Sequence, residues 1–199
     1  MNTSRPEDFT LKKGDALLIV DVQNDFLPGG SLAVKGGENI IAPFNQYIEA
    51  VQAKALPILA TRDWHPPNHC SFKEQGGPWP PHCVVDSKGA EFPSELRLPP
   101  SAVVISKGMQ VEKDAYSGFE ETDLDERLRS AHIHRVLIGG LATDYCVLNT
   151  VRDAIKHGYE VLLLQDAMAA VNVQPEDGEK AIEEMTSLGA IPITLEMIA

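Results

Sequence analysis

Short apolar segments rich in branched side chains recur along the chain and alternate with amphipathic segments. The apolar segments are nearly continuous, which is typical of strands covered on both faces in a parallel sheet. They are residues 16–22, 56–62, 102–108, 135–141, 160–166 and 190–195. Helical spacing of apolar positions is found in residues 38–54, 123–132, 145–157 and 176–188. The alternation predicts an α/β protein: a three-layer α/β/α sandwich with a mostly parallel, Rossmann-like sheet of about six strands.

Several polar residues and one glycine mark the ends of these segments. Asp123 and Asp144 are predicted to be helix N-caps, and Gly158 is predicted to stop the third helix. Asp25 and Asp166 also lie near strand ends, and we interpret them as turn or capping residues.

One long segment, residues 63–100, interrupts the alternation. It is rich in Pro, Gly and His, and a loop of this length in a compact domain is usually functional or disordered. Its aromatic and imidazole side chains argue against disorder; they are Trp64, Trp79, His65, His69 and His82. We therefore predict a site loop at about 63–100 within a single domain that spans residues 1–199.

Composition and charge restrict the partners of the protein. The chain has 199 residues, 43% of them hydrophobic, and a formal net charge of -12. That size supports one domain with a substantial core. An acidic surface repels phosphate backbones, which argues against a nucleic-acid partner and favours a neutral small substrate.

Cysteine usage and the apolar segments predict a compartment. The three cysteines, Cys70, Cys83 and Cys146, are an odd number, which argues against a disulfide framework. The first residues are polar and do not resemble a signal peptide, and no apolar run approaches the roughly 20 residues of a membrane span. We expect a cytoplasmic protein without a membrane partner.

Chemically capable residues stand at the predicted strand ends. Asp21 ends the first strand, Asp63 and His65 end the second, and Lys107 ends the third. The fourth strand ends just before the segment that carries Cys146. Ligands of open α/β sheets bind beyond the carboxyl ends of the strands, so we expect these side chains to share one edge.

Asp63 and His65 are candidate metal ligands. They are two residues apart, so an extended backbone points both side chains to one face. His82 can complete a site that suits zinc, iron or manganese, and His69 is a further candidate. The alternative is that these are loop histidines with ordinary hydrogen bonds.

Cys146 is the candidate nucleophile. It opens a predicted helix, where unsatisfied N–H groups and the helix dipole favour the thiolate and can bind an oxyanion. The alternative is a small buried hydrophobic residue. Cys70 and Cys83 lie among the loop histidines, where either can bind metal or oxidise, but neither has a helix start to activate it.

Asp21 and Lys107 complete the set of candidate catalytic residues. Each is costly to bury alone, so each needs a partner. An ammonium beside a thiol and a carboxylate favours both ionised forms, and the carboxylate can move a proton. The alternative is a structural ion pair between Asp21 and Lys107.

Five segments of the chain together resemble a known family. They are IVDVQNDFLPGGSLAV, TRDWHPPNH, GGPWPPHCV, ISKGMQVEKDAYSGF and IGGLATDYCVLNT. In this order they look like signatures of the nicotinamidase branch of the isochorismatase-like cysteine hydrolases. The resemblance covers about residues 15–195.

The resemblance implies a role for each matching position. Cys146 matches the nucleophile, and Asp21 and Lys107 match its catalytic partners. The matching metal ligands are Asp63, His65 and His82, with a further ligand near His69 in some members. The matching substrate-binding residues are Phe26, Trp79 and Tyr116. The bond from Leu141 to Ala142 matches a cis peptide, and the N–H groups of Ala142 and Cys146 match the oxyanion hole.

The resemblance also implies an activity. It is the hydrolysis of nicotinamide to nicotinate and ammonia through a cysteine thioester, as part of NAD salvage. One divalent metal ion, zinc first and iron or manganese next, would orient the pyridine ring. Pyrazinamide is a second candidate substrate, and relatives are often homo-oligomers.

Three alternatives remain at this point. A sibling amidase would use the same three residues on an N-carbamoyl or ureido substrate, without a metal for a ring nitrogen. A binding protein on this fold would have a dead site, which the intact Asp21, Lys107 and Cys146 disfavour. Isochorismate hydrolysis needs no thiol, and its anionic substrate suits an acidic surface poorly.

Overall fold

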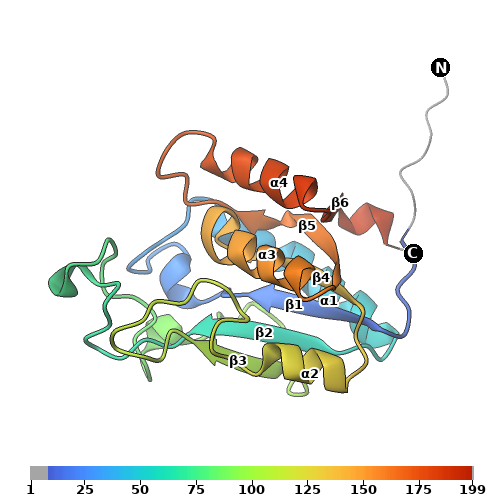
Figure 1. Ribbon diagram of the computed structural model, residues 1–199, viewed down its shortest axis with the longest axis horizontal. Helices are drawn as coiled ribbons and strands as arrows, with labels where there is room; N and C mark the ends of the chain where they lie inside the picture. The colour runs from blue at the N-terminus through green and yellow to red at the C-terminus, as the bar shows by residue number, and fades with distance from the viewer. Residues whose placement is uncertain (1–8, 199) are drawn as a thin grey trace.

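A computed structural model describes residues 9–198 of the chain and contains one six-stranded parallel sheet (Figure 1). The strand order is β3-β2-β1-β4-β5-β6, and every neighbouring pair is parallel. The strands are β1 (Asp15–Val20), β2 (Ile58–Asp63), β3 (Val103–Lys107), β4 (Arg135–Leu141), β5 (Glu160–Ala169) and β6 (Ile191–Ile193). The helices are α1 (Ile41–Ala53), α2 (Leu124–Ser130), α3 (Leu148–Lys156) and α4 (Asp177–Ser187). The predicted α/β class and six-stranded parallel sheet are confirmed.

Two hydrophobic layers enclose the sheet, because successive side chains of a buried strand point to opposite faces. Leu17 and Ile19 of β1 face α1 and pack against Phe44. Leu18 of β1 faces the other layer, in which α2, α3 and α4 bury side chains such as Val151. Figure 1 shows α1 behind the sheet and the other three helices in front of it. The result is the predicted three-layer α/β/α sandwich.

The predicted segments differ from the observed elements by at most three residues at each end of a strand. The helices α1 and α3 begin three residues later than predicted because a different turn precedes each of them. The 3-10 turn η2 (Gly37–Ile40) precedes α1, and the π-helical turn η5 (Thr143–Val147) precedes α3. The second of these turns carries Cys146.

The predicted helix caps have different outcomes. Asp123 precedes α2 as predicted, but its carboxylate receives hydrogen bonds from Arg127 and not from a main-chain N–H. Gly158 follows α3 with a φ of 92°, the left-handed conformation that stops a helix. Asp144 is not an N-cap: it lies inside η5, and its carboxylate accepts the N–H groups of Val171 at 2.9 Å and Asn172 at 2.8 Å.

The long segment between β2 and β3 is an ordered loop that lies beyond the carboxyl ends of the strands (Figure 1, green, left). It contains two short 3-10 turns, η3 (Lys73–Gln75) and η4 (Lys88–Ala90). Parallel bridges join His65 to Val84 and Phe72 to Trp79. The loop therefore covers the sheet edge on which the candidate residues stand. Within residues 9–198, no helix is long and apolar enough to cross a membrane.

Candidate active site

Four strand ends bring Asp21, Asp63, Lys107 and Cys146 together. Asp63 and Lys107 end the neighbouring strands β2 and β3 and are register partners there. The sulfur of Cys146 and one carboxylate oxygen each of Asp21 and Asp63 lie within 4.8 Å of one another. All four residues are buried. The sequence prediction that they share one edge of the sheet is confirmed by this geometry.

The Lys107 ammonium lies at the centre of this cluster. Its three N–H groups donate to Asp63 Oδ1 at 2.5 Å, to the carbonyl oxygen of Ala115 at 3.0 Å and to Cys146 Sγ at 3.6 Å. Burial alone would lower the pKa of Lys107, but the carboxylates of Asp21 and Asp63 outweigh it and raise that pKa. The side chain is therefore an ammonium ion at neutral pH.

The two carboxylate oxygens of Asp21 have different surroundings. Oδ1 accepts a hydrogen bond of 2.6 Å from the Thr61 hydroxyl. Oδ2 forms an ion pair with Lys107 Nζ at 2.9 Å and accepts no hydrogen bond from any other group among the described residues. Burial raises the pKa of Asp21, and Lys107 opposes that rise only in part. Oδ2 is thus a free proton acceptor beside the thiol.

The surroundings of Cys146 differ from the sequence prediction in one respect. The prediction places the thiolate at a helix start, where N–H groups stabilise it. Burial instead raises the pKa of the Cys146 thiol; Lys107 lowers it, while Asp21 and Asp63 raise it further. Desolvation of the sulfur outweighs the nearby ammonium, so the resting residue is a thiol. Its ionisation requires a neighbouring base.

Asp63, His65 and His82 form a second cluster, and they offer ligand atoms within 4.8 Å of one another. Asp63 Oδ1 is bonded to Lys107, whereas Oδ2 faces His65 Nε2 at 3.6 Å. The Nδ1 atom of His65 donates to the Gly108 carbonyl at 2.9 Å, and that of His82 donates to the Pro80 carbonyl at 2.8 Å. A carbonyl only accepts, so in the neutral form of each ring, Nε2 has its lone pair directed to the cluster.

This donor set fits a divalent metal ion. One carboxylate oxygen and two neutral imidazole nitrogens are typical ligands of zinc, iron or manganese. Each ligand residue here makes a further hydrogen bond that orients it: Asp63 with Lys107, His65 with the Gly108 carbonyl and His82 with the Pro80 carbonyl. The neighbouring group of Asp21, Asp63 and Cys146 also has ligand spacing. There, however, the Lys107 ammonium already supplies the positive charge, so the histidine cluster is the candidate metal site.

His69 lies next to the metal candidates but does not join them. Its ring stacks on that of His65 with centroids 4.1 Å apart. Nδ1 is 2.7 Å from the Ser71 hydroxyl, and Nε2 is 3.1 Å from the Lys113 carbonyl. Both ring nitrogens are therefore engaged on the far side of His65.

Gly108 is required by the same cluster. Its φ is +63°, and a Cβ built there would lie 2.5 Å from Cε1 of His65. Only glycine allows the backbone to pass so close to the imidazole that its carbonyl holds. Lys107 at the end of β3 and Gly108 directly after it thus serve the two clusters.

A mostly apolar pocket opens above Cys146. The residues that line it include the three predicted substrate-binding residues, Phe26, Trp79 and Tyr116, as well as Ala142. The Trp79 indole N–H donates to the Tyr116 hydroxyl at 3.1 Å. The peptide bond between Leu141 and Ala142 is cis, as the resemblance predicts.

Sequence reasoning missed several residues that line this pocket. They are Leu32, Val34, Tyr145 and Val171. The Tyr145 ring meets Trp79 edge to face, with centroids 5.1 Å apart. Its position next to Cys146 is the only sequence signal that could have identified it, and nothing in the local pattern singles out the others.

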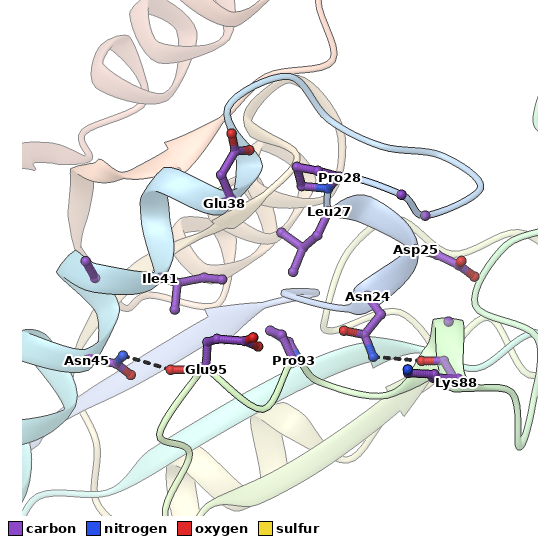
Figure 2. Close-up of a pocket in the computed structure, with 14 residues that line it drawn as sticks. Asn24, Asp25, Leu27, Pro28, Glu38, Ile41, Asn45, Lys88, Pro93 and Glu95 are labelled. Atoms are coloured by element: carbon purple, nitrogen blue, oxygen red, sulfur yellow. Dashed lines mark hydrogen bonds between the residues drawn. The ribbon is translucent and has the colours of Figure 1, made fainter.

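A larger hollow of about 920 Å³ lies elsewhere on the surface (Figure 2). It is bounded by η1 (Asn24–Phe26), the start of α1 and the loop around Lys88 and Pro93. None of Asp21, Lys107 and Cys146 lines it. Cys146 lines the smaller pocket instead, so size does not locate the candidate site.

A buried thiol, carboxylate and ammonium lie together at the carboxyl edge of this parallel sheet, an arrangement that suits an α/β hydrolase. The sequence profile of the Isochorismatase domain matches residues 15–197. The chain belongs to the isochorismatase family, as its resemblance predicts.

Individual relatives share this fold and much of the sequence. The nicotinamidase of Escherichia coli is 40% identical, and the match covers 90% of this chain and 94% of the relative. The pyrazinamidase of Pyrococcus horikoshii in complex with zinc has a TM-score of 0.88 and 52% identity, over 92% of this chain and 99% of that chain. The L. infantum protein PnC1 in complex with nicotinate has a TM-score of 0.89 and 38% identity, over 96% of this chain and 98% of that chain.

Proposed function

We propose that the protein hydrolyses nicotinamide to nicotinate and ammonia, and that it serves NAD salvage. The observation that carries this proposal is the position of Asp63, which joins two clusters. One oxygen of Asp63 binds the Lys107 ammonium, and the other faces His65 in the candidate metal site. A nucleophilic centre is thus adjacent to a site that can hold the ring of a substrate. The nicotinamidase and pyrazinamidase relatives support the choice of substrate.

The pocket supports a flat and neutral substrate. In the proposed complex the pyridine ring lies between Phe26 and Trp79, with Tyr116 as part of the wall. Lys107 is paired with two carboxylates, and no Lys or Arg lines the pocket among residues 9–198. A carboxylate substrate such as isochorismate would find no free Lys or Arg side chain there. A neutral carboxamide needs none.

Asp63, His65 and His82 would hold a divalent metal ion in this proposal. When bound, the metal would act as a Lewis acid toward the ring nitrogen and thereby fix the orientation of the ring. The zinc complex of the related pyrazinamidase supports zinc, and the ligand set also suits iron or manganese.

The first half of the reaction transfers the acyl group to sulfur. Asp21 Oδ2 takes the proton of the Cys146 thiol, and the thiolate forms a C–S bond to the carboxamide carbon. Lys107 stays charged beside both groups and stabilises the thiolate as it forms. The N–H groups of Ala142 and Cys146 stabilise the oxyanion. Asp21 then gives its proton to the amide nitrogen, the C–N bond breaks, and ammonia leaves.

The second half returns the enzyme to its resting state. Asp21 takes a proton from water, and the oxygen forms a bond to the thioester carbon. The C–S bond breaks, the proton on Asp21 returns to the Cys146 sulfur, and the acid formed leaves as nicotinate after giving its remaining proton to ammonia in solution. The elements of one water molecule are therefore divided between nicotinate and ammonia, and no other reactant is needed.

The experiment is ammonia release from nicotinamide by the purified protein, before chelation, after chelation, and after addition of zinc, iron or manganese. We expect activity that is lost on chelation and restored by metal, and lost in Cys146→Ala but kept in Cys70→Ser. Hydrolysis of an N-carbamoyl amino acid in preference to nicotinamide would instead favour the sibling amidase. An inert wild-type protein in all metal states would contradict the proposal. A cytoplasmic location and a homo-oligomer remain predictions from the sequence.

A further inference from the structure

The backbone turns away from the sheet at the end of β1 and leaves a gap beside Asp63. Asp21 has a φ of 48°, and its carbonyl accepts the N–H of Gln23 at 2.9 Å. In a continued parallel ladder, that carbonyl would instead accept the N–H of Asp63. The strand β2 runs on to Asp63, so both main-chain polar groups of Asp63 face a strand that has ended.

The side chain of Gln23 fills this gap. Its Oε1 accepts the Asp63 N–H at 2.8 Å, and its Nε2 donates to the Asp63 carbonyl at 2.8 Å. The second Nε2 hydrogen donates to the Ala90 carbonyl at 2.9 Å. The side-chain amide thus replaces one peptide unit of the missing strand. Both donors are used, and the side chain is fully buried.

Asp63 is the residue whose position matters most to both clusters. Its Oδ1 lies 2.5 Å from Lys107 Nζ, and its Oδ2 must remain directed toward His65 and His82. The side chain can divide its oxygens in this way only while its own backbone is held. Gln23 holds that backbone from the side opposite to β3.

We propose that Gln23 is a positioning residue for the metal site, acting through the backbone of Asp63. This inference rests on the proposed metal-dependent function. Gln23 is absent from both ligand clusters and does not line the pocket above Cys146. Its loss should weaken metal binding, because groups behind a metal ligand typically change affinity by about 10–100-fold.

Asn24 provides a matched control for a merely structural role. Figure 2 shows its amide directed to the main chain of Lys88, and this hydrogen bond is 2.8 Å long. It holds the same η4 segment that Gln23 reaches at Ala90, but it does not touch Asp63. Asn24→Ala therefore weakens the attachment of the loop and leaves the gap beside Asp63 filled.

Two uncharged variants remove the bonds of Gln23. Gln23→Met keeps the length and shape of the side chain without its donors and acceptor. Gln23→Asn keeps the amide but is shorter by one methylene, so it cannot span the same distance. If burial of unpaired main-chain groups prevents Gln23→Met from folding, Gln23→Asn provides the test.

The measurement is the dissociation constant for zinc of the full-length protein, obtained by competition with a chelator of known affinity at a temperature where each variant is folded. We expect a rise of about tenfold or more in the Gln23 variants and no change in Asn24→Ala. An unchanged constant in either folded Gln23 variant overturns the proposal, and so does an equal rise in Asn24→Ala, which would assign the effect to the loop. A wild-type protein that binds no zinc, iron or manganese overturns the metal site itself.

Discussion

The Thr61 hydroxyl donates a hydrogen bond of 2.6 Å to Asp21 Oδ1 and also lies 3.2 Å from the Asp21 N–H, as an acceptor. The backbone carbonyl of Thr61 is a further acceptor for that N–H at 3.2 Å. One threonine on β2 thus fixes both the main chain and one carboxylate oxygen of Asp21. The other oxygen is the only buried side-chain oxygen or nitrogen within residues 9–198 that lacks a hydrogen bond.

The first prediction concerns the Thr61 hydroxyl. Thr61→Val removes a donor that lowers the pKa of Asp21, so that pKa should rise. Because the proposed base is active only when ionised, the acid limb of the pH profile of kcat/KM should move to higher pH. Loss of a hydrogen bond to a charged group, worth about 1.5–3 kcal/mol, should also lower kcat/KM at neutral pH by about tenfold or more.

Thr150→Val is the matched control for Thr61→Val. It removes an equally buried hydroxyl, which accepts the Gly118 N–H at 2.9 Å and does not touch Asp21. Its pH profile should keep the wild-type acid limb. If the acid limb of Thr61→Val also stays in place, Asp21 is not the base that this limb reports.

The second prediction concerns Lys107. Lys107→Met leaves two buried carboxylates without their cation, which should destabilise the fold by about 3–5 kcal/mol. Because the ammonium lowers the pKa of Cys146, its loss should raise that pKa further. Alkylation requires the thiolate, so the rise in alkylation rate should move to higher pH.

Alkylation of Cys146 is measured in a Cys70→Ser background, because Cys70 is partly exposed. Lys113→Met is the matched control, since Lys113 pairs with Glu121 outside the cluster. An unchanged alkylation profile in Lys107→Met would make Lys107 a structural ion-pair partner only.

The third prediction concerns the aromatic wall of the pocket. Tyr116→Phe removes the acceptor of the Trp79 indole N–H and leaves the ring in place. Loss of one neutral hydrogen bond, worth about 1 kcal/mol, should raise KM for nicotinamide about fivefold and change kcat little. Tyr159→Phe makes the same change in a tyrosine that does not line the pocket and should leave KM unchanged. A fall in kcat at constant KM would contradict a role in substrate binding.

The fourth prediction separates two histidines of the loop. His82→Ala should reduce bound zinc, measured by elemental analysis after loading and desalting, because His82 belongs to the ligand cluster. His69→Ala should retain zinc, because both ring nitrogens of His69 are engaged with Ser71 and Lys113. Retention in His82→Ala, or loss in His69→Ala, would require a different ligand set.

The sequence by itself determined the layers of the fold and the edge that carries the chemistry. Short continuous apolar segments rich in branched residues are typical of strands covered on both faces, and parallel strands bring all their carboxyl ends to one side. The sequence therefore predicts that Asp21, Asp63, Lys107 and Cys146 are neighbours. The family resemblance added the substrate and the role expected of each residue.

Only the tertiary structure decided how protons and lone pairs are arranged within that edge. The surroundings of Asp21 Oδ2 depend on how Lys107 Nζ is placed among Asp21, Asp63 and Cys146, and the raised pKa of the Cys146 thiol depends on its burial. The linear sequence does not distinguish His82, which belongs to the ligand cluster, from His69, whose ring nitrogens contact Ser71 and Lys113. The role of Gln23 follows from a turn at Asp21 that no local pattern predicts. Hydrogen-bond directions are set by contacts between distant segments, and spacing along the chain does not contain them.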